Sequence, residues 1–294
     1  MSNIKKYNIE EQYEGMRLID FLRGKHKYSR KSIVALKKSG GVMVNGSIGY
    51  MNIRLKRDDI LEITFLDSES ENILPEQMDL DIVFEDESLI VINKKPGILV
   101  HPTRKHIMGT LANGLAYLWL GEGTPKKVRP INRLDRDTSG LVIFAKNAHV
   151  QHLMSFYAGK EEFKKEYTAL VHGTMEELEG TIDQPIAPEI EKAMRRVIRE
   201  DGDKSVTHFK TIAMYPEYSV VNITLETGRT HQIRVHMSHI GHPILGDTFY
   251  GGDTALIDRQ ALHARKITIL HPITNQWHSF EAPIPDDMER LITF

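Results

Sequence analysis

The stretch INRLDRDTSGLVIFAK, residues 131–146, joins a cluster of charges to a strongly apolar run. The run LVIFA has the composition of a strand that is buried on both faces. If the preceding chain is extended, Arg133, Asp135 and Asp137 point to one side and Leu134 points to the other. Gly140 permits a bend into the strand. Asp135 is then expected at a sheet edge, where a shielded carboxylate needs a cation or hydrogen-bond donors. A structural Arg–Asp network that closes a turn is the alternative interpretation.

Further strands are expected around this stretch. Short apolar runs dominate the chain from residue 81 onward: DIVFED, LIVINK, YTALVHG, SVVNITLE and KITIL. Helices are expected near 108–119, 147–157 and 230–240. Because strands and helices alternate irregularly, without a repeating βα unit, the sequence predicts an α+β domain with a mixed or antiparallel sheet. It has no glycine-rich phosphate loop, which argues against a nucleotide cofactor.

A second polar stretch, LETGRTHQIRVHMSHIGHPILGD, covers residues 225–247. Thr227 and Gly228 indicate a turn, and Thr230 is a candidate cap for the helix that follows. Arg229 lies at the turn and could supply the cation that Asp135 needs, because a guanidinium can bond a carboxylate at two points. The four histidines of this stretch lack the spacing of a zinc-binding pair, and the chain has no cysteine, so no metal site is expected.

Two more stretches carry polar residues within structural patterns. In FKKEYTALVHG, residues 163–173, alternation places Lys165, Tyr167, Ala169 and Val171 on one face of a strand. A tyrosine in this setting is more often part of a core than catalytic. NKKPGILVHP, residues 93–102, indicates by itself only a sharp turn beside positive charge.

The N-terminal segment differs from the rest of the chain in charge. Residues 1–66 hold 13 Lys or Arg against 7 Asp or Glu, whereas residues 67–90 hold 9 acids and no base. Residues 13–66 predict two short helices, a hairpin at Asn45–Gly46 and a closing strand. We expect a small basic RNA-binding domain over 1–66, an acidic linker over 67–80 and a catalytic domain over 81–294. A solvated charged surface is the alternative interpretation of the lysines.

Bulk properties exclude several classes of protein. The 294 residues carry a net charge of −2 and no cysteine, which fits a reducing compartment. No apolar run approaches the roughly 20 residues of a membrane span. The first residues lack the apolar stretch of a signal peptide. We therefore expect a soluble, cytoplasmic protein, with a monomer as the default state.

Taken together, these stretches resemble the RluA-type family of RNA pseudouridine synthases. The matching motifs occur in the family's order: NKKPGILVHP, INRLDRDTSGLVIFAK, KEYTALVHG, ETGRTHQIRVHMSHIGHPILGD with YGG, and ALHARKITILHP. The resemblance covers about residues 81–283 and implies a curved mixed sheet with flanking helices and an RNA cleft. Separately, residues 13–66 resemble the small RNA-binding domain, named after a small-subunit ribosomal protein, that recurs in RNA-modifying enzymes.

The resemblance implies isomerisation of uridine to pseudouridine in RNA, ribosomal rather than transfer RNA, with no cofactor and no metal. It implies that Asp135 is the catalytic aspartate, either as a nucleophile or as an electrostatic stabiliser, and that Arg229 pairs with it. Tyr167 would lie under the uracil and, in the glycal route proposed for the family, help to remove a ribose proton. Arg133 would fill the space that the flipped base vacates. Further RNA contacts are expected from a larger set of residues: Arg136, Lys94, His101, Arg23, Lys25, Arg30, Lys31, Lys37 and Lys38.

One position departs from the family pattern. Asn132 stands where the family usually has histidine before RLD, and we expect an adjusted contact rather than an inactive enzyme. A catalytically silent RNA-binding or folding factor with the same cleft is the main alternative function. A nucleobase hydrolase of similar geometry is a third, and it would release free uracil.

Overall fold

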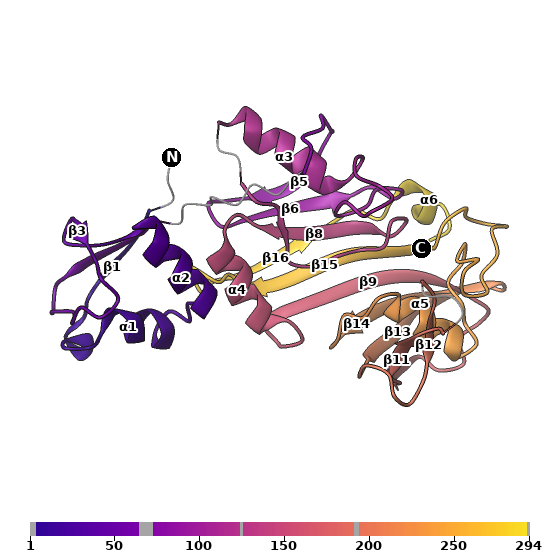
Figure 1. Cartoon of the computed structure of the whole chain (residues 1–294). Coiled ribbons are helices and arrows are strands. Elements are labelled where there is room, and N and C mark those ends of the chain that lie inside the picture. Colours follow the sequence, from indigo (N-terminus) through magenta and orange to yellow (C-terminus); the bar gives the residue numbers. More distant parts are fainter. Residues whose placement is uncertain (1–3, 65–72, 124–125, 191–193, 293–294) are drawn as a thin grey trace.

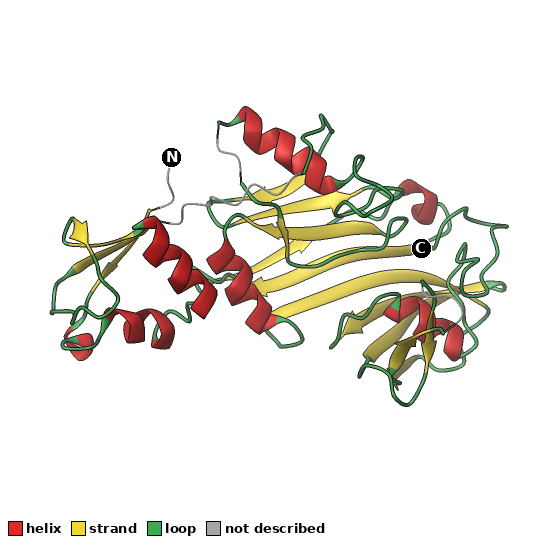
Figure 2. Cartoon of the chain, viewed as in Figure 1, coloured by secondary structure: helices red, strands yellow, loops and turns green. Residues whose placement is uncertain are grey.

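The computed structural model describes residues 4–64, 73–123, 126–190 and 194–292, without the side chains of Ile4 and Lys31. Figure 1 shows a small N-terminal unit beside a larger body that is built on a long curved sheet. Figure 2 shows that strands make up most of the body and that helices lie around them. The predicted α+β class is confirmed. No described helix is long and apolar enough to cross a membrane.

The N-terminal unit has its own sheet and its own core. The strand order is β1-β4-β2-β3, and every pairing is antiparallel. Twelve buried residues, among them Leu18, Leu22 and Leu61, form a core separate from those of the body. Strand β1 was not predicted, because most of its side chains are polar and show no alternation of apolar and polar residues. The elements are β1 (Ile4–Asn8), a 3-10 turn (Glu11–Tyr13), α1 (Leu18–Gly24), α2 (Arg30–Ser39), β2 (Val42–Val44), β3 (Ser47–Ile48) and β4 (Ile60–Thr64).

Local sequence signals fix the ends of these elements. The Ser29 side chain accepts a hydrogen bond from the Ser32 amide and caps α2. Gly40 ends the helix at φ 64°, in the left-handed region that glycine adopts without strain. Asn45 and Gly46 both have positive φ, as a tight two-residue hairpin requires.

The body is a ten-stranded mixed sheet. Its main path is β10-β13-β14-β9-β15-β8-β6-β5, with β16 paired to β15 and β7 paired to β8. The strands are β5 (Ile82–Glu85), β6 (Leu89–Lys94), β7 (Arg129–Pro130), β8 (Ser139–Ala145), β9 (Phe163–His172), β10 (Glu179–Asp183), β13 (Val206–Met214), β14 (Tyr218–Leu225), β15 (Leu262–Leu270) and β16 (Trp277–Glu281). A separate two-stranded hairpin pairs β11 (Ile186–Pro188) with β12 (Arg196–Ile198).

The two halves of the sheet meet where β8 runs parallel to β15. His263 pairs with Ser139 and Ala264 pairs with Gly140, whereas the other pairings of the sheet are antiparallel. Gly140 has φ 107°, and an added Cβ would lie 2.3 Å from the Ala264 carbonyl oxygen. Only glycine fits this position, so the bend predicted at Gly140 is confirmed. This junction places the chain before β8 at the centre of the body.

Helices cover both faces of the sheet. The predicted helices are found as α3 (Leu111–Gly121), α4 (Ala148–Tyr157) and α5 (Gln232–His239), and a short α6 (Asp286–Glu289) lies near the C-terminus. Helices α3 and α5 belong to the larger core, with Ile92, Val142 and Ile223. Helix α4 packs through Val150 and Met154 on a second cluster that contains Leu141 and Ile143. Successive residues of β8 therefore point into different cores.

Part of the segment predicted as a linker packs on the body. Residues 67–72 lie outside the described residues, but residues 73–80 pack on α3. The Asn113 side chain donates to the Leu74 carbonyl over 2.8 Å, and the Glu76 amide donates to the Asn113 carbonyl. Met78 and Leu80 pack against the larger core. The expected start of the body at residue 81 is therefore wrong, since the body begins by residue 73.

The N-terminal unit touches the body at α4. The Tyr28 ring stacks on the His149 ring with centroids 3.9 Å apart and planes inclined by 16°. Both residues are almost fully buried. In Figure 1, α2 of the small unit lies beside α4.

Candidate active site

The loop between β7 and β8 carries the predicted catalytic motif. Asn132 is buried: its Oδ1 accepts from the Ile143 amide over 2.9 Å, and its Nδ2 donates to the Leu141 carbonyl over 3.1 Å. Two hydrogen bonds thus fasten the start of the loop to the adjacent strand. The Thr138 amide donates to the Asp135 carbonyl, which closes a turn over residues 135–138. The loop is therefore a fixed turn, not the extended segment that alternation suggested.

Lys94 supports the same loop from within. Its side chain is 1% exposed, and its ammonium donates to the carbonyls of Lys95, Ile98 and Arg136 over 2.7–3.0 Å. Burial lowers the pKa of Lys94 to about 7, whereas three carbonyl acceptors match the three N–H bonds of the charged form. The prediction that Lys94 binds RNA is wrong, because the amine is inside the fold and holds the backbone of residue 136.

Helix α5 supplies the opposite side of the site. Gln232 fixes its start: Oε1 accepts from Thr227 and from the Arg229 amide, and Nε2 donates to Val206 and Thr207. The predicted cap at Thr230 is wrong, because His231 is the residue before the helix and has φ 58°. A histidine in the left-handed region is strained, so the surrounding contacts must hold it there.

Asp135 meets Arg234, and Arg234 in turn meets Asp247. The Arg234 Nη1 donates to Asp135 Oδ2 over 2.9 Å, while Nε and Nη2 bond both carboxylate oxygens of Asp247 over 2.6 and 2.8 Å. The side chains are 9% exposed for Arg234, 1% for Asp247 and 26% for Asp135. Asp247 thus fixes the guanidinium, and the guanidinium presents one N–H to Asp135. Among the described residues, Asp135 Oδ1 has no hydrogen-bond partner.

His231 is the second group that faces Asp135. Its Nε2 lies 3.7 Å from Asp135 Oδ2, and its Nδ1 shares a 2.8 Å hydrogen bond with the Tyr250 hydroxyl. The same hydroxyl accepts from the Arg196 amide. Burial lowers the pKa of His231, although the charge of Asp135 acts in the opposite direction. A neutral His231 at pH 7 leaves Arg234 as the cation that touches Asp135.

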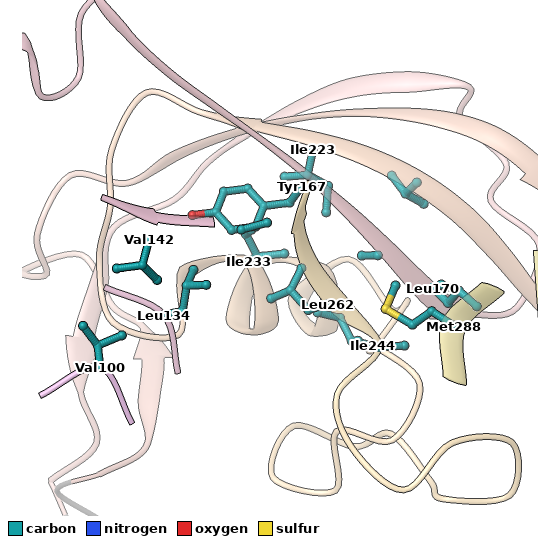
Figure 3. Packing of buried hydrophobic residues seen from close by; sticks show 14 of the residues in the cluster. Val100, Leu134, Val142, Tyr167, Leu170, Ile223, Ile233, Ile244, Leu262 and Met288 are labelled. Carbon is teal, nitrogen blue, oxygen red and sulfur yellow. The ribbon is translucent and has the colours of Figure 1, made fainter. Parts of the chain in front are cut away.

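Tyr167 lies in the larger core beneath the same region. Figure 3 shows its ring beside Ile223 and Ile233, with Leu134 nearby. The side chain is 6% exposed. Burial, and then the charge of Asp135, raise the pKa of Tyr167, so the phenol is protonated at neutral pH. Tyr167 is thus close enough to Asp135 to feel its charge.

The predicted partner of Asp135 is wrong. Arg229 is exposed, and its Nε donates to the Lys204 carbonyl over 3.2 Å, away from the carboxylate. Arg234, five residues further on, takes the predicted place. A sequence signal for it was present, because Arg234 lies with Ile233 and Met237 on the inward stripe of the helix. Asp247, His231 and Tyr250 were also missed, since their contacts join segments that are distant in the chain.

Apart from Lys94, the predicted RNA-binding residues lie either in the body or in the N-terminal unit. Arg133 and Arg136 are exposed on the loop, and Arg136 pairs with Asp137 over 3.0 Å. His101 is half-buried, and its Nδ1 makes no hydrogen bond to a described residue. In the N-terminal unit, exposed basic side chains lie on or beside α1 and α2, whereas that of Lys31 is outside the described residues: Arg23, Lys25, Arg30, Lys37 and Lys38. Within the described chain no cluster of His, Asp and Glu side chains could hold a metal ion.

Residues 88–239, more than half of the chain, match the RNA pseudouridylate synthase family. The "Uncharacterized RNA pseudouridine synthase YjbO" of Bacillus subtilis (strain 168) is 41% identical over 266 residues, which cover 90% of this chain and 94% of that protein. The "Ribosomal large subunit pseudouridine synthase D" of Neisseria meningitidis (strain Z2491) is 36% identical over 90% of this chain and 75% of that protein.

A solved structure agrees with these sequences. The structure of "Human RNA Pseudouridylate Synthase Domain Containing 1" is 26% identical and superposes with a TM-score of 0.56, over 73% of this chain and 86% of that one. The family match and these relatives define an RNA pseudouridine synthase. The chain belongs to the RluA-type family of these enzymes and isomerises uridine in RNA to pseudouridine.

Proposed function

We propose that Asp135 is the catalytic carboxylate of this enzyme and that Arg234, not Arg229, holds it in place. The observation that carries the proposal is the Asp135–Arg234–Asp247 chain. A partly exposed carboxylate has one oxygen bonded to a buried guanidinium and the other without a partner. Asp135 is thus ready to act on an electron-poor carbon.

The reaction needs such a group at the anomeric carbon. The glycosidic bond between C1′ and N1 breaks, the uracil turns, and a bond from C1′ to C5 replaces it. The proton of C5 is lost and N1 gains one, so no atom enters or leaves in sum. Asp135 attacks C1′ or stabilises the positive charge that develops there. The target base must leave its stack to reach the carboxylate.

Tyr167 takes the position beneath the flipped uracil. Its ring belongs to the core, and its raised pKa keeps the phenol protonated in the resting enzyme. A protonated phenol is a poor base, which favours a packing role over removal of a ribose proton. Arg133, exposed on the loop, is placed to stack in the gap that the base leaves.

We further propose that the substrate is ribosomal RNA of the large subunit. Several relatives that align with 90% or more of this chain are named ribosomal large subunit pseudouridine synthase D. The basic N-terminal unit fits this role, because exposed lysines and arginines that contact phosphates position an RNA without reading its sequence.

The first prediction tests Asp135. We expect Asp135→Asn to abolish pseudouridine formation on an unmodified large-subunit RNA transcript, while RNA binding stays within about threefold of wild type. Asp137→Asn, a nearby carboxylate without contact to Arg234, is the matched control. Activity of Asp135→Asn within about tenfold of wild type, a barrier change of only about 1.4 kcal/mol, would remove Asp135 from its role. Full-length wild type with no turnover would favour a silent RNA-binding factor, and release of free uracil would favour a hydrolase.

The choice of RNA is tested by competition. Equimolar unmodified transcripts of large-subunit RNA, small-subunit RNA and a transfer RNA are incubated with limiting enzyme, and pseudouridines are mapped in each. Conversion confined to the large-subunit transcript is expected. Preferred conversion of the transfer RNA would contradict the proposal about the substrate and leave the role of Asp135 untouched.

A further inference from the structure

We propose that Phe249 is a stacking platform for the RNA base next to the target uridine. The inference deepens the proposed function, since it rests on Asp135 as the place where the flipped uridine reacts. Phe249 lies in a turn, and Asp247 before it and Tyr250 after it are both buried. Its side chain is 41% exposed, whereas Asp247 and Tyr250 are 2% and 4% exposed. An aromatic ring that stays in water on such a turn has no role in the core.

The turn that carries Phe249 is held on both sides. Asp247 accepts two hydrogen bonds from Arg234, and its carbonyl accepts from the amides of Tyr250 and Gly252. The Ser238 hydroxyl donates to the Tyr250 carbonyl over 2.7 Å. The ring is therefore presented by a fixed backbone, and little conformational freedom is lost when a ligand stacks on it.

The contacts of the ring leave stacking to a ligand. Phe249 meets His231 and Tyr250 edge-to-face, with ring planes at 86° and 85° and centroids 5.9 and 5.2 Å apart. Within the described part of the chain no ring stacks in parallel on Phe249. A nucleobase is the flat group that an enzyme acting on RNA brings to such a surface, because every base has a face that stacks on an aromatic ring.

The position of the ring selects the neighbouring base rather than the target. The Arg234 Cζ lies 5.9 Å from the Phe249 ring centroid, and the same guanidinium bonds Asp135. His231 likewise contacts the ring on one side and faces Asp135 on the other. The target uracil must travel inward, toward Asp135 and the buried Tyr167. Phe249 lies further out, where a base that stays in the RNA strand would pass.

Other exposed aromatic residues do not share this setting. Phe156, on α4, is 46% exposed, and its ring contact is with His152. It has the same side chain and nearly the same exposure as Phe249, but no contact with a residue that touches Asp135. Phe156→Ala is therefore a matched control for the loss of an exposed ring.

The test measures binding and turnover separately. Dissociation constants are measured in the Asp135→Asn background, which removes turnover, with an unmodified large-subunit RNA fragment that contains the mapped target. Stacking on an aromatic side chain contributes about 1–3 kcal/mol per base, so Phe249→Ala should weaken binding about 5- to 150-fold. Phe249→Trp should bind within about threefold of the parent, Phe249→Leu should resemble Phe249→Ala, and Phe156→Ala should change little.

A second RNA identifies the base that stacks. An abasic nucleotide is placed on the 5′ or the 3′ side of the target uridine. At one of the two sides it should weaken binding by the parent protein as much as Phe249→Ala does, and the two changes should not add. With Asp135 intact, Phe249→Ala should slow conversion at subsaturating RNA by the same factor by which it weakens binding.

Three results would overturn the proposal. Phe249→Ala could bind the RNA as tightly as the parent protein does, or Phe249→Leu could do so. Alternatively, the loss of affinity caused by Phe249→Ala could add to that caused by the abasic nucleotide at both positions. Each can occur while Asp135→Asn is inactive, so failure of this inference is distinct from failure of the proposed function. Thermal unfolding of each variant, measured in parallel, verifies that the exposed substitution leaves the fold intact.

Discussion

At the scale of single residues, the site depends on which arginine meets Asp135. The sequence suggested Arg229 because it lies at a turn beside the helix. Arg234 lies on the inward stripe of α5, which was a signal in its favour, but only the contacts of the folded chain show which arginine meets Asp135. Asp247, which fixes Arg234, lies 13 residues further along. Lys94 shows the same limit: its neighbour Lys95 is exposed, but Lys94 is buried and holds the loop that carries Asp135.

The second prediction compares the two arginines. We expect Arg234→Met to lower the free energy of unfolding by about 3–5 kcal/mol, because it leaves Asp247 as a buried charge without a partner. Isomerisation should also fall by at least tenfold, because Asp135 loses its cation. Arg229→Met should change stability by no more than about 0.5 kcal/mol, since Arg229 is exposed.

A double variant separates the structural from the catalytic effect. Adding Asp247→Asn to Arg234→Met removes the unpaired buried charge, so urea unfolding should show part of the stability restored. Turnover should stay low, because Asp135 is still without its guanidinium. Equal loss of activity in Arg229→Met and Arg234→Met would contradict this assignment of the pair.

At the scale of elements, most of the body followed from its sequence patterns. The long apolar runs gave β6, β8, β14 and β15, and Gly140 was correctly placed at the bend into β8. Strand β1 did not follow, because its side chains are mainly polar and Lys5 takes an inward position there; burial lowers the pKa of Lys5. Residues 73–80 were predicted to be a linker because they are acidic and polar in composition. Two apolar residues within them, Met78 and Leu80, nevertheless pack against the larger core.

The third prediction concerns the attachment of the catalytic loop to β8. Asn132→Ala removes the acceptor of the buried Ile143 amide and the donor to the Leu141 carbonyl. An unsatisfied buried backbone group costs about 1–3 kcal/mol, so urea unfolding should show a loss in that range. Asn132→His, the residue usual in the family, can both donate and accept one hydrogen bond and should keep activity within about tenfold. If Asn132→His folds but is inactive, a histidine cannot replace the two hydrogen bonds that the Asn132 side chain makes to Leu141 and Ile143.

At the scale of the whole molecule, buried histidines make stability depend on pH. His263 is 1% exposed, shares a 2.9 Å hydrogen bond with Ser139, and lies at the β8–β15 junction. Burial lowers the pKa of His263 from 6.5 to about 4. His149 stacks on Tyr28 between the N-terminal unit and the body, and burial lowers its pKa to about 3. Both rings are neutral in the folded protein at pH 7.

The fourth prediction is a loss of stability in mild acid. Below pH 6.5 the unfolded chain binds a proton at each of these histidines and the folded chain does not, so the free energy of unfolding falls as the pH is lowered toward 4. His263 alone contributes up to about 3 kcal/mol, at 1.4 kcal/mol per unit. His263→Gln should flatten the pH dependence, while His239→Gln, an exposed control, should not. Equal slopes for His263→Gln and wild type would contradict the prediction.

The fifth prediction addresses how the N-terminal unit helps the body to bind RNA. Lys37 and Lys38 are exposed in the last turn of α2, on the unit that touches α4 through Tyr28. If they contact phosphates, each contact releases counterions on binding, and the logarithm of the association constant falls with the logarithm of the salt concentration. Replacing both by glutamine should make that slope shallower by up to about 0.7–0.9 per lost contact.

The comparison uses the full chain, so that the packing between the unit and α4 is kept. The control replaces Lys160 and Lys210, two exposed lysines of the body, by glutamine and removes the same net charge. Phosphate contacts position an RNA without reading its bases, so Lys37→Gln with Lys38→Gln should weaken different RNAs by similar factors and leave turnover at saturating RNA unchanged. Equal slopes for the two double variants would make α2 an ordinary charged surface, and the RNA-binding role would then have to lie elsewhere in the chain.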